Sequence, residues 1–229
     1  MRSTIDAKAG RDPGPRPSAG VGTIASKGFA AVRKKPKIVA AYLIVALASL
    51  IGGTLTGFVD ILVAGYAVVV AYRALGGEPA AERSFGVRLA IVFVANLIAG
   101  IAVVIGLLLL VVPGVYLLVR FRLVTAAVML EDRGPVDALA RSYELTEGHG
   151  WTVFGVVVLF GALGFLLVLL AGFEIGAFGG EGFTVATVEE ASRVGGAVGA
   201  LLVTPVAVSA NAVMYQLYAG GESPGNEGS

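Results

Sequence analysis

Charged side chains inside long apolar segments are the residues of this sequence that could do chemistry. Arg120, Arg122 and Asp60 lie within such segments. An arginine at the bilayer centre costs about 2.5–3.5 kcal/mol on insertion scales, so each needs a partner, a wet cavity or a route to the headgroups. One interpretation is an anion or headgroup site, and the other is a buried ion pair that orients helices. We predict that Asp60 pairs with Arg120, which leaves Arg122 without an evident acidic partner.

Two asparagines, Asn96 and Asn211, are the other polar side chains deep in apolar segments. Amide groups there typically hydrogen-bond to a neighbouring helix, an interaction worth about 0.6–1 kcal/mol in membranes. Together with the three charged residues they complete a candidate intramembrane polar site. Its members are Asp60, Asn96, Arg120, Arg122 and Asn211.

Residue types that catalysis and metal binding usually require are scarce. The sequence has no cysteine and a single histidine, His149, which excludes thiol nucleophiles, disulfides and His-rich metal clusters. Glu131 and Asp132 are adjacent acids, but they precede a predicted helix and we expect them to cap it. The sequence has no phosphate-binding glycine loop and no catalytic triad. We therefore predict no catalytic residue, no metal and no cofactor, and we predict that the protein is not an enzyme.

The composition indicates what kind of element must hold these residues. Hydrophobic residues make up 56% of the chain and charged residues 14%, whereas roughly 25% of the residues of soluble domains are charged. Apolar runs separated by short charged segments fill residues 38–218, which is too much apolar surface for a soluble domain of this length. The net charge of +1 gives no bias toward nucleic acid. We predict an all-α, polytopic membrane helix bundle.

Segment length divides the apolar region into about six transmembrane helices. The first run, Ile38–Leu75, would form a helix of about 57 Å, roughly twice the hydrocarbon thickness, so it must fold back. Gly52-Gly53 supply that break. The same argument places a tight turn at Pro113-Gly114, and Pro205 interrupts the last span. The predicted spans are 38–54, 57–74, 87–112, 115–130, 152–171 and 193–218.

Two further helices, at 21–35 and 135–148, have one apolar face and are predicted to lie in the membrane interface. For the first of them an ordinary linker is the alternative. Its basic residues are candidate contacts for lipid headgroups. These candidates are Lys27, Arg33, Lys34, Lys35 and Lys37. Residues 1–20 are predicted to be a disordered tail, and 219–229 a polar tail.

Lysine and arginine set the predicted orientation, because they concentrate on the cytoplasmic side of membrane proteins. Fourteen of the 17 lie in the N-terminal region or near the connections at 73–88 and 131–150, whereas the opposite side has Arg193 alone. Both termini are therefore predicted to be cytoplasmic, in a multi-pass protein of the cell membrane. This topology puts Arg120 toward the outer leaflet. Alternatively, Val115–Val119 form a re-entrant piece that leaves the two arginines in the headgroup region.

Part of the sequence resembles a known family. The segments Pro113–Arg120, Ala127–Glu131 and Gly134–Thr146, with Pro205 and Tyr215–Tyr218, resemble the membrane domain found beside glycerophosphodiester phosphodiesterase catalytic domains and in related prokaryotic families. The resemblance implies a six-helix membrane domain. It does not carry over the phosphodiesterase activity, because in that family the activity resides in a separate barrel domain with metal-binding acids and histidines, for which this chain has no room.

These observations predict a non-catalytic module that interacts with the membrane or organises it through a basic, lipid-facing N-terminal helix. The alternative is a small transporter or permease subunit with a polar path near Arg120, Arg122 and Asp60. Membrane lipids are the predicted partners. Small residues spaced by four, such as Gly195 and Gly199, allow close helix contact. A protein partner or a second copy of this chain is therefore a further candidate.

Overall fold

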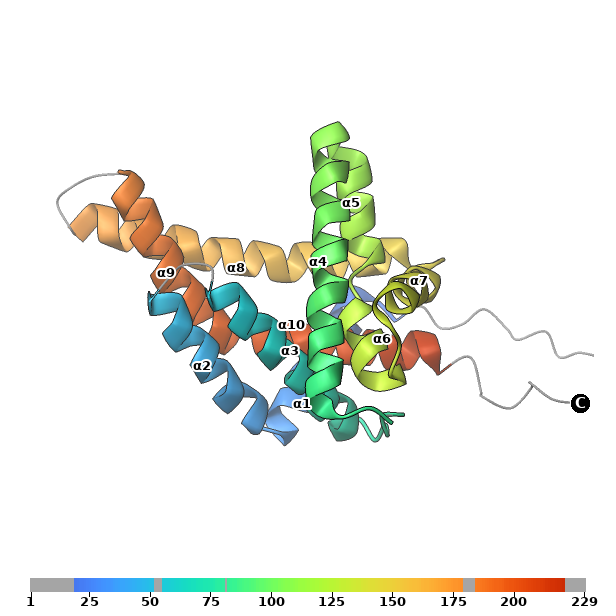
Figure 1. Ribbon diagram of the computed structural model, residues 1–229. Coiled ribbons are helices and arrows are strands. Elements are labelled where there is room, and N and C mark those ends of the chain that lie inside the picture. The colour runs from blue at the N-terminus through green and yellow to red at the C-terminus, as the bar shows by residue number, and fades with distance from the viewer. Residues whose placement is uncertain (1–18, 52–54, 81, 179–183, 221–229) are drawn as a thin grey trace, which may run out of the picture.

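The computed structural model describes residues 19–51, 55–80, 82–178 and 184–220, and within these ranges the protein is built from helices without strands (Figure 1). Predicted features at residues 1–18, Gly52-Gly53 and 221–229 lie outside the described residues. The helices are α1 (Val21–Lys34), α2 (Lys37–Ile51), α3 (Leu55–Ala74), α4 (Phe85–Leu109), α5 (Val111–Arg120), α6 (Val124–Glu131), α7 (Pro135–Thr146), α8 (Gly150–Phe178), α9 (Val185–Leu202) and α10 (Thr204–Ala219).

Four of the apolar segments are long enough to cross a membrane. They are Thr56–Ala74, Phe85–Leu109, Val111–Glu131 and Gly150–Gly176. The pair α9 and α10, bent by 48°, is a fifth if it counts as one span, and α2 is a shorter apolar helix. These helices are those of a membrane-spanning protein, and they confirm the predicted all-α membrane bundle.

Helix α10 contributes strongly to the core, since eleven of its 16 residues are buried. It runs through the middle of the molecule, behind α3, while the hairpin of α4 and α5 projects beyond the other helices (Figure 1). The long helix α8 crosses that hairpin instead of running alongside it (Figure 1). The projecting end of the hairpin is strongly exposed, with Leu108 at 81% and Val112 at 78%. Such an apolar end suits a lipid environment.

The turn between α4 and α5 differs from the predicted one. The helix breaks at Leu110, and Pro113 and Gly114 belong to the first turns of α5. Proline is tolerated there because the first N–H groups of a helix have no intrahelical partner. Gly114 instead allows close packing, since a Cβ added to Gly106 would lie 2.9 Å from the Cα of Gly114. The glycine pair therefore holds the hairpin together, and an extended residue makes the turn.

The predicted span 115–130 is also not continuous. A turn at Phe121–Leu123 separates α5 from α6. Ser142 of α7 replaces the missing helical hydrogen bonds: its hydroxyl donates to the carbonyl oxygen of Arg120 at 2.7 Å and accepts from the amide of Leu123 at 3.1 Å. Because buried backbone groups must be paired, the fully buried Ser142 makes this break stable. The sequence contains no glycine or proline at this position to reveal it.

The connection between α8 and α9 also differs from the predicted one. The expected loop at 172–192 is largely helical, since α8 continues to Phe178 and α9 already begins at Val185. A capping box at Thr184 and Thr187 fixes the start of α9. The interruption expected near Pro205 is present, with Pro205 in the first turn of α10.

Helix α1 is the helix predicted at 21–35. Its apolar face packs against the protein instead of the membrane interface. Ile24, Gly28 and Val32 are buried. A Cβ added to Gly28 would lie 3.0 Å from backbone atoms of Val206 and Ala210 in α10. Helix α1 is therefore fixed on α10 by close backbone contact, and its charged side faces outward.

Candidate functional site

Arg120 ends α5 with its guanidinium between two tyrosine rings. Its central carbon lies 4.9 Å from the ring centroid of Tyr116 and 4.4 Å from that of Tyr143 in α7. The two hydroxyls are 2.7 Å apart, and this hydrogen bond raises the pKa of Tyr143 above its ordinary value. Arg120 also donates from Nη1 to the carbonyl oxygen of Tyr143 at 3.4 Å. Cation–π contacts of this kind hold a guanidinium plane in place.

The predicted pair of Asp60 with Arg120 is not formed. The electrostatic partners of Asp60 are instead Arg122 and the hydroxyl of Tyr42 in α2. No N–O contact of 4.0 Å or less joins Asp60 to an arginine within the described residues. Arg122 lies in the turn after α5, so its side chain leaves the chain in a different direction from that of Arg120. Arg122, for which the sequence showed no acidic partner, is thus the arginine that interacts electrostatically with Asp60.

The two asparagines do not join these charges. Asn96 donates from Nδ2 to the carbonyl oxygen of Val92 at 2.8 Å and to Oγ1 of Thr125 at 3.2 Å, which links α4 to α6. Asn211 is buried in α10, and its Oδ1 atom has no hydrogen-bond partner among the described residues. In the part of the chain that the structure describes, no hydrogen bond or ion pair joins any two of the five predicted polar-site residues. Apart from the electrostatic interaction of Asp60 with Arg122, they therefore form separate polar positions instead of one site.

Glu131 and Asp132, which we call the acidic junction, have a different role from the predicted one. Neither caps α7, whose N-cap residue is Gly134 without a side-chain hydrogen bond. Glu131 accepts hydrogen bonds from Arg133, from Nε of Arg141 at 3.0 Å and from the hydroxyl of Tyr215 at 2.8 Å. It therefore ties the α6–α7 connection to α10.

Asp132 extends the acidic junction to the segment before α4. Its Oδ2 atom accepts from the amides of Glu82 at 3.0 Å and Arg83 at 2.7 Å, and its carbonyl oxygen accepts from Nη1 of Arg83 at 2.8 Å. Its backbone adopts the left-handed conformation, with φ of 57°, which aspartate tolerates better than most residues. The sequence does contain a signal for this junction: arginines lie in the connections at 73–88 and 131–150, and the second connection also holds the two adjacent acids.

Arg88 is a buried arginine that sequence reasoning assigned to a connection. Its side chain is 6% exposed, and Nη1 donates to the carbonyl oxygen of Met129 at 2.6 Å. The guanidinium also lies 5.8 Å from the ring of Phe85. It thus joins α4 to α6, in the same way as Asn96 does further along α4.

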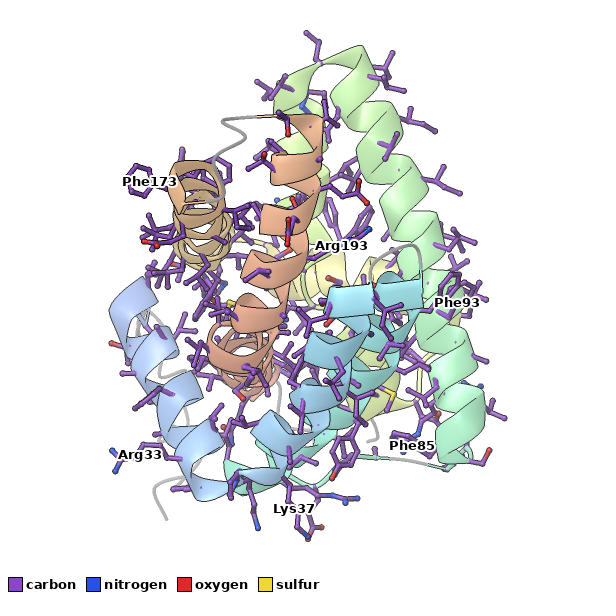
Figure 2. All side chains as sticks on the ribbon, turned by 90° about the vertical axis from the view of Figure 1, so that its left-hand side faces the viewer. Arg33, Lys37, Phe85, Phe93, Phe173 and Arg193 are labelled. Carbon is purple, nitrogen blue, oxygen red and sulfur yellow. The ribbon has the colours of Figure 1, made fainter. Side chains whose placement is uncertain are left out.

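The five basic residues predicted to contact headgroups lie on α1 and at the turn between α1 and α2, and we call this surface the basic corner. Its members are Lys27, Arg33, Lys34, Lys35 and Lys37, all of them exposed. None forms an ion pair with a residue that the structure describes. Arg33 and Lys37 point away from the bundle at this corner, whereas Arg193 lies apart from it on α9 (Figure 2).

A groove of about 630 Å³ opens between α5 and the beginning of α8, and we call it the α5–α8 groove. Apolar side chains form most of its wall, and Arg120 lies in it. Its lining residues are Val111, Val112, Val115, Tyr116, Val119, Arg120, Gly148, Gly150, Trp151 and Phe154. Trp151 is 87% exposed, and it is the single tryptophan of the chain. Among the described residues no group of three histidines or acids could hold a metal ion.

These features define a class: a helical membrane protein with broken spans, a basic corner and arginines next to apolar surface. Residues 50–218 match the family described as a domain of unknown function (DUF7847). Because the match covers most of the chain, the protein belongs to this family. No curated protein and no solved structure matches the chain. The resemblance to the membrane domain beside glycerophosphodiester phosphodiesterases stays a prediction.

Proposed function

We propose that the protein is a non-catalytic membrane module that binds anionic lipid headgroups through its basic corner. The observation that carries this proposal is the set of five exposed basic side chains on α1 and the following turn, which have no acidic partners among the described residues. A lysine or arginine near an anionic membrane surface contributes about 1 kcal/mol of attraction. Several such residues at one corner select anionic over zwitterionic lipid.

The packing of α1 supports an electrostatic mode of binding. Its buried residues Ile24, Gly28 and Val32 contact the protein, so this apolar face is not free to insert into lipid. The exposed side offers charge, with Phe29 as its large apolar residue. Binding through charge is screened by salt, whereas binding through inserted apolar surface is not. We therefore expect lipid binding to depend strongly on salt.

The same charges support an orientation. We propose that the protein lies in the cell membrane with both termini in the cytoplasm, because the basic corner and the connections around Arg83 and Arg133 share an excess of positive charge. Arg193 belongs to the opposite set of connections and forms an ion pair with Glu189 at 2.6 Å. Anionic lipids are most abundant in the cytoplasmic leaflet, which is the leaflet that the basic corner would face.

Spin-labelled lipids provide the test, with the full chain reconstituted in vesicles. The ratio of association constants for labelled phosphatidylglycerol and phosphatidylcholine is measured by electron paramagnetic resonance. We expect a ratio well above one for the native chain and a several-fold lower ratio for the triple variant K34Q/K35Q/K37Q. The matched control is Arg193→Gln, which removes one charge at the other end and should leave the ratio unchanged. A triple variant with the native ratio would refute the proposal.

A transporter or permease subunit is the second candidate, favoured by one observation. Arg122 and Asp60 interact electrostatically inside the spans without an N–O contact within 4.0 Å, and Nε of Arg122 is buried without a hydrogen-bond partner among the described residues. Such a gap suits a bound ion or water, and broken helices often line transport sites. Because the chain contains no cysteine, Asp60→Cys can be probed with a membrane-impermeant maleimide. Labelling would support a polar path, and complete protection would exclude one that reaches this residue.

A further inference from the structure

We propose that the α5–α8 groove is a binding site for one anionic phospholipid, with the phosphate at Arg120 and an acyl chain along α5. The site shares no residue with the basic corner. It therefore goes beyond the function proposed above, which concerns lipids that adjoin the α1–α2 turn.

The shape of the groove fits an extended apolar chain. Val111, Val115 and Val119 recur at every fourth residue and so lie along one side of α5. From Val111 to Arg120 the helix rises about 13 Å. Phe154 closes the groove from the side of α8. The groove thus offers a long apolar path that ends at a single cationic group.

The charge of Arg120 is available to a ligand. A guanidinium has five N–H donors. Among the described residues Arg120 donates to the carbonyl oxygen of Tyr143 at 3.4 Å and interacts with the hydroxyl of Tyr116. Its Nε atom has no partner there, so donors remain for a ligand. The charge of Glu147 acts on the two tyrosines, but Glu147 forms no ion pair with Arg120. The tyrosine rings hold the guanidinium plane in position. Planar, oriented N–H donors of this kind match phosphate oxygens.

We take α5 here as the re-entrant piece described above, which leaves Arg120 in the headgroup region instead of inside a span. Its neighbours are α7, whose Tyr143 and Glu144 are exposed, and the link from α7 to Trp151. Tryptophan is typical of the boundary between lipid chains and headgroups. The opposite end of the groove, at Val111 and Val112, is strongly exposed apolar surface at the projecting end of the hairpin. A phospholipid bound with its phosphate at Arg120 would therefore direct its acyl chain toward the membrane interior.

Trp151 makes the test specific, because it lines the groove and no other tryptophan contributes fluorescence. The full chain is reconstituted in vesicles that contain phosphatidylglycerol or phosphatidylcholine with brominated acyl chains, and contact quenching of Trp151 gives the relative affinity for the two lipids. We expect a preference for the anionic lipid of about fivefold, as one basic residue near a membrane surface supplies. Arg120→Gln should reduce that preference to about onefold.

Two further variants distinguish lipid binding in the groove from lipid binding at the basic corner and from a simple effect of charge. K34Q/K35Q/K37Q should keep the preference seen at Trp151, because it leaves the groove intact, whereas it should lower the overall association measured with spin-labelled lipids. Arg120→Lys keeps the charge but loses the planar stacking, so it should show an intermediate preference. Thermal unfolding of each variant checks that it remains folded. Equal quenching by both lipids in the native chain, or a preference that Arg120→Gln leaves unchanged, would overturn the proposal.

Discussion

Replacing Ser142 by alanine tests whether this side chain supports the break between α5 and α6. The hydroxyl donates to the carbonyl oxygen of Arg120 and accepts from the amide of Leu123, and Ser142 is fully buried. Without it both backbone groups lose their partners at a place where neither has a helical one. An unpaired buried polar group costs about 1–3 kcal/mol. We expect Ser142→Ala to lower the free energy of unfolding by about 2 kcal/mol, about half from each group.

The measurement is reversible unfolding in mixed micelles of dodecyl maltoside and increasing dodecyl sulfate, followed by circular dichroism. The matched control is Ser192→Ala. The hydroxyl of Ser192 donates to the carbonyl oxygen of Val188 at 2.8 Å on an exposed side of α9, where water can replace the bond. That control should change stability by less than about 0.5 kcal/mol. If the free energies of unfolding of the two variants differ by less than that amount, Ser142 neither supports the break between α5 and α6 nor fixes the position of Arg120.

Three further changes test the packing and the acidic junction, each by the same unfolding measurement. Glu131→Gln should destabilise by about 2–3 kcal/mol, because hydrogen bonds from two arginines and a tyrosine lose their charged acceptor; a loss below about 0.5 kcal/mol would contradict this role. Gly28→Val should destabilise strongly, since its Cβ would meet α10 backbone at 3.0 Å, whereas a Cβ at Gly22 would meet no atom within 4 Å, so Gly22→Val should have a much smaller effect. Asn96→Leu should cost about 0.6 kcal/mol, the average for a hydrogen bond between membrane helices.

Much of the fold could be predicted from the sequence, because chain length and hydropathy leave few choices in a bilayer. A run as long as Ile38–Leu75 has to fold back, and charged segments mark where helices end. The bend at Pro205 follows from the missing N–H of proline. The breaks at Leu110 and at Phe121–Leu123 could not be predicted in the same way. The first depends on the contact of two glycines on opposite sides of the turn, and the second on a serine from another helix.

The candidate polar site was harder to predict, because it depends on the directions of side chains. Arg120 and Arg122 are two residues apart, and the turn between α5 and α6 separates their surroundings, so that Arg122 is the one that interacts electrostatically with Asp60. The partner of Arg120 is a pair of aromatic rings, one of them on α7. A search for opposite charges does not find such a partner. The basic corner was easier to predict, because lysines and arginines next to an apolar helix can be recognised in the sequence.

The salt dependence of lipid selection tests the central claim most directly. Full-length protein in vesicles is titrated with sodium chloride while the association constants for spin-labelled phosphatidylglycerol and phosphatidylcholine are measured. If the basic corner binds headgroups through charge, the ratio of the two constants falls steadily and approaches one near about 1 M salt, where the Debye length is about 3 Å. A ratio that starts at one, or one that salt leaves unchanged, would contradict the claim.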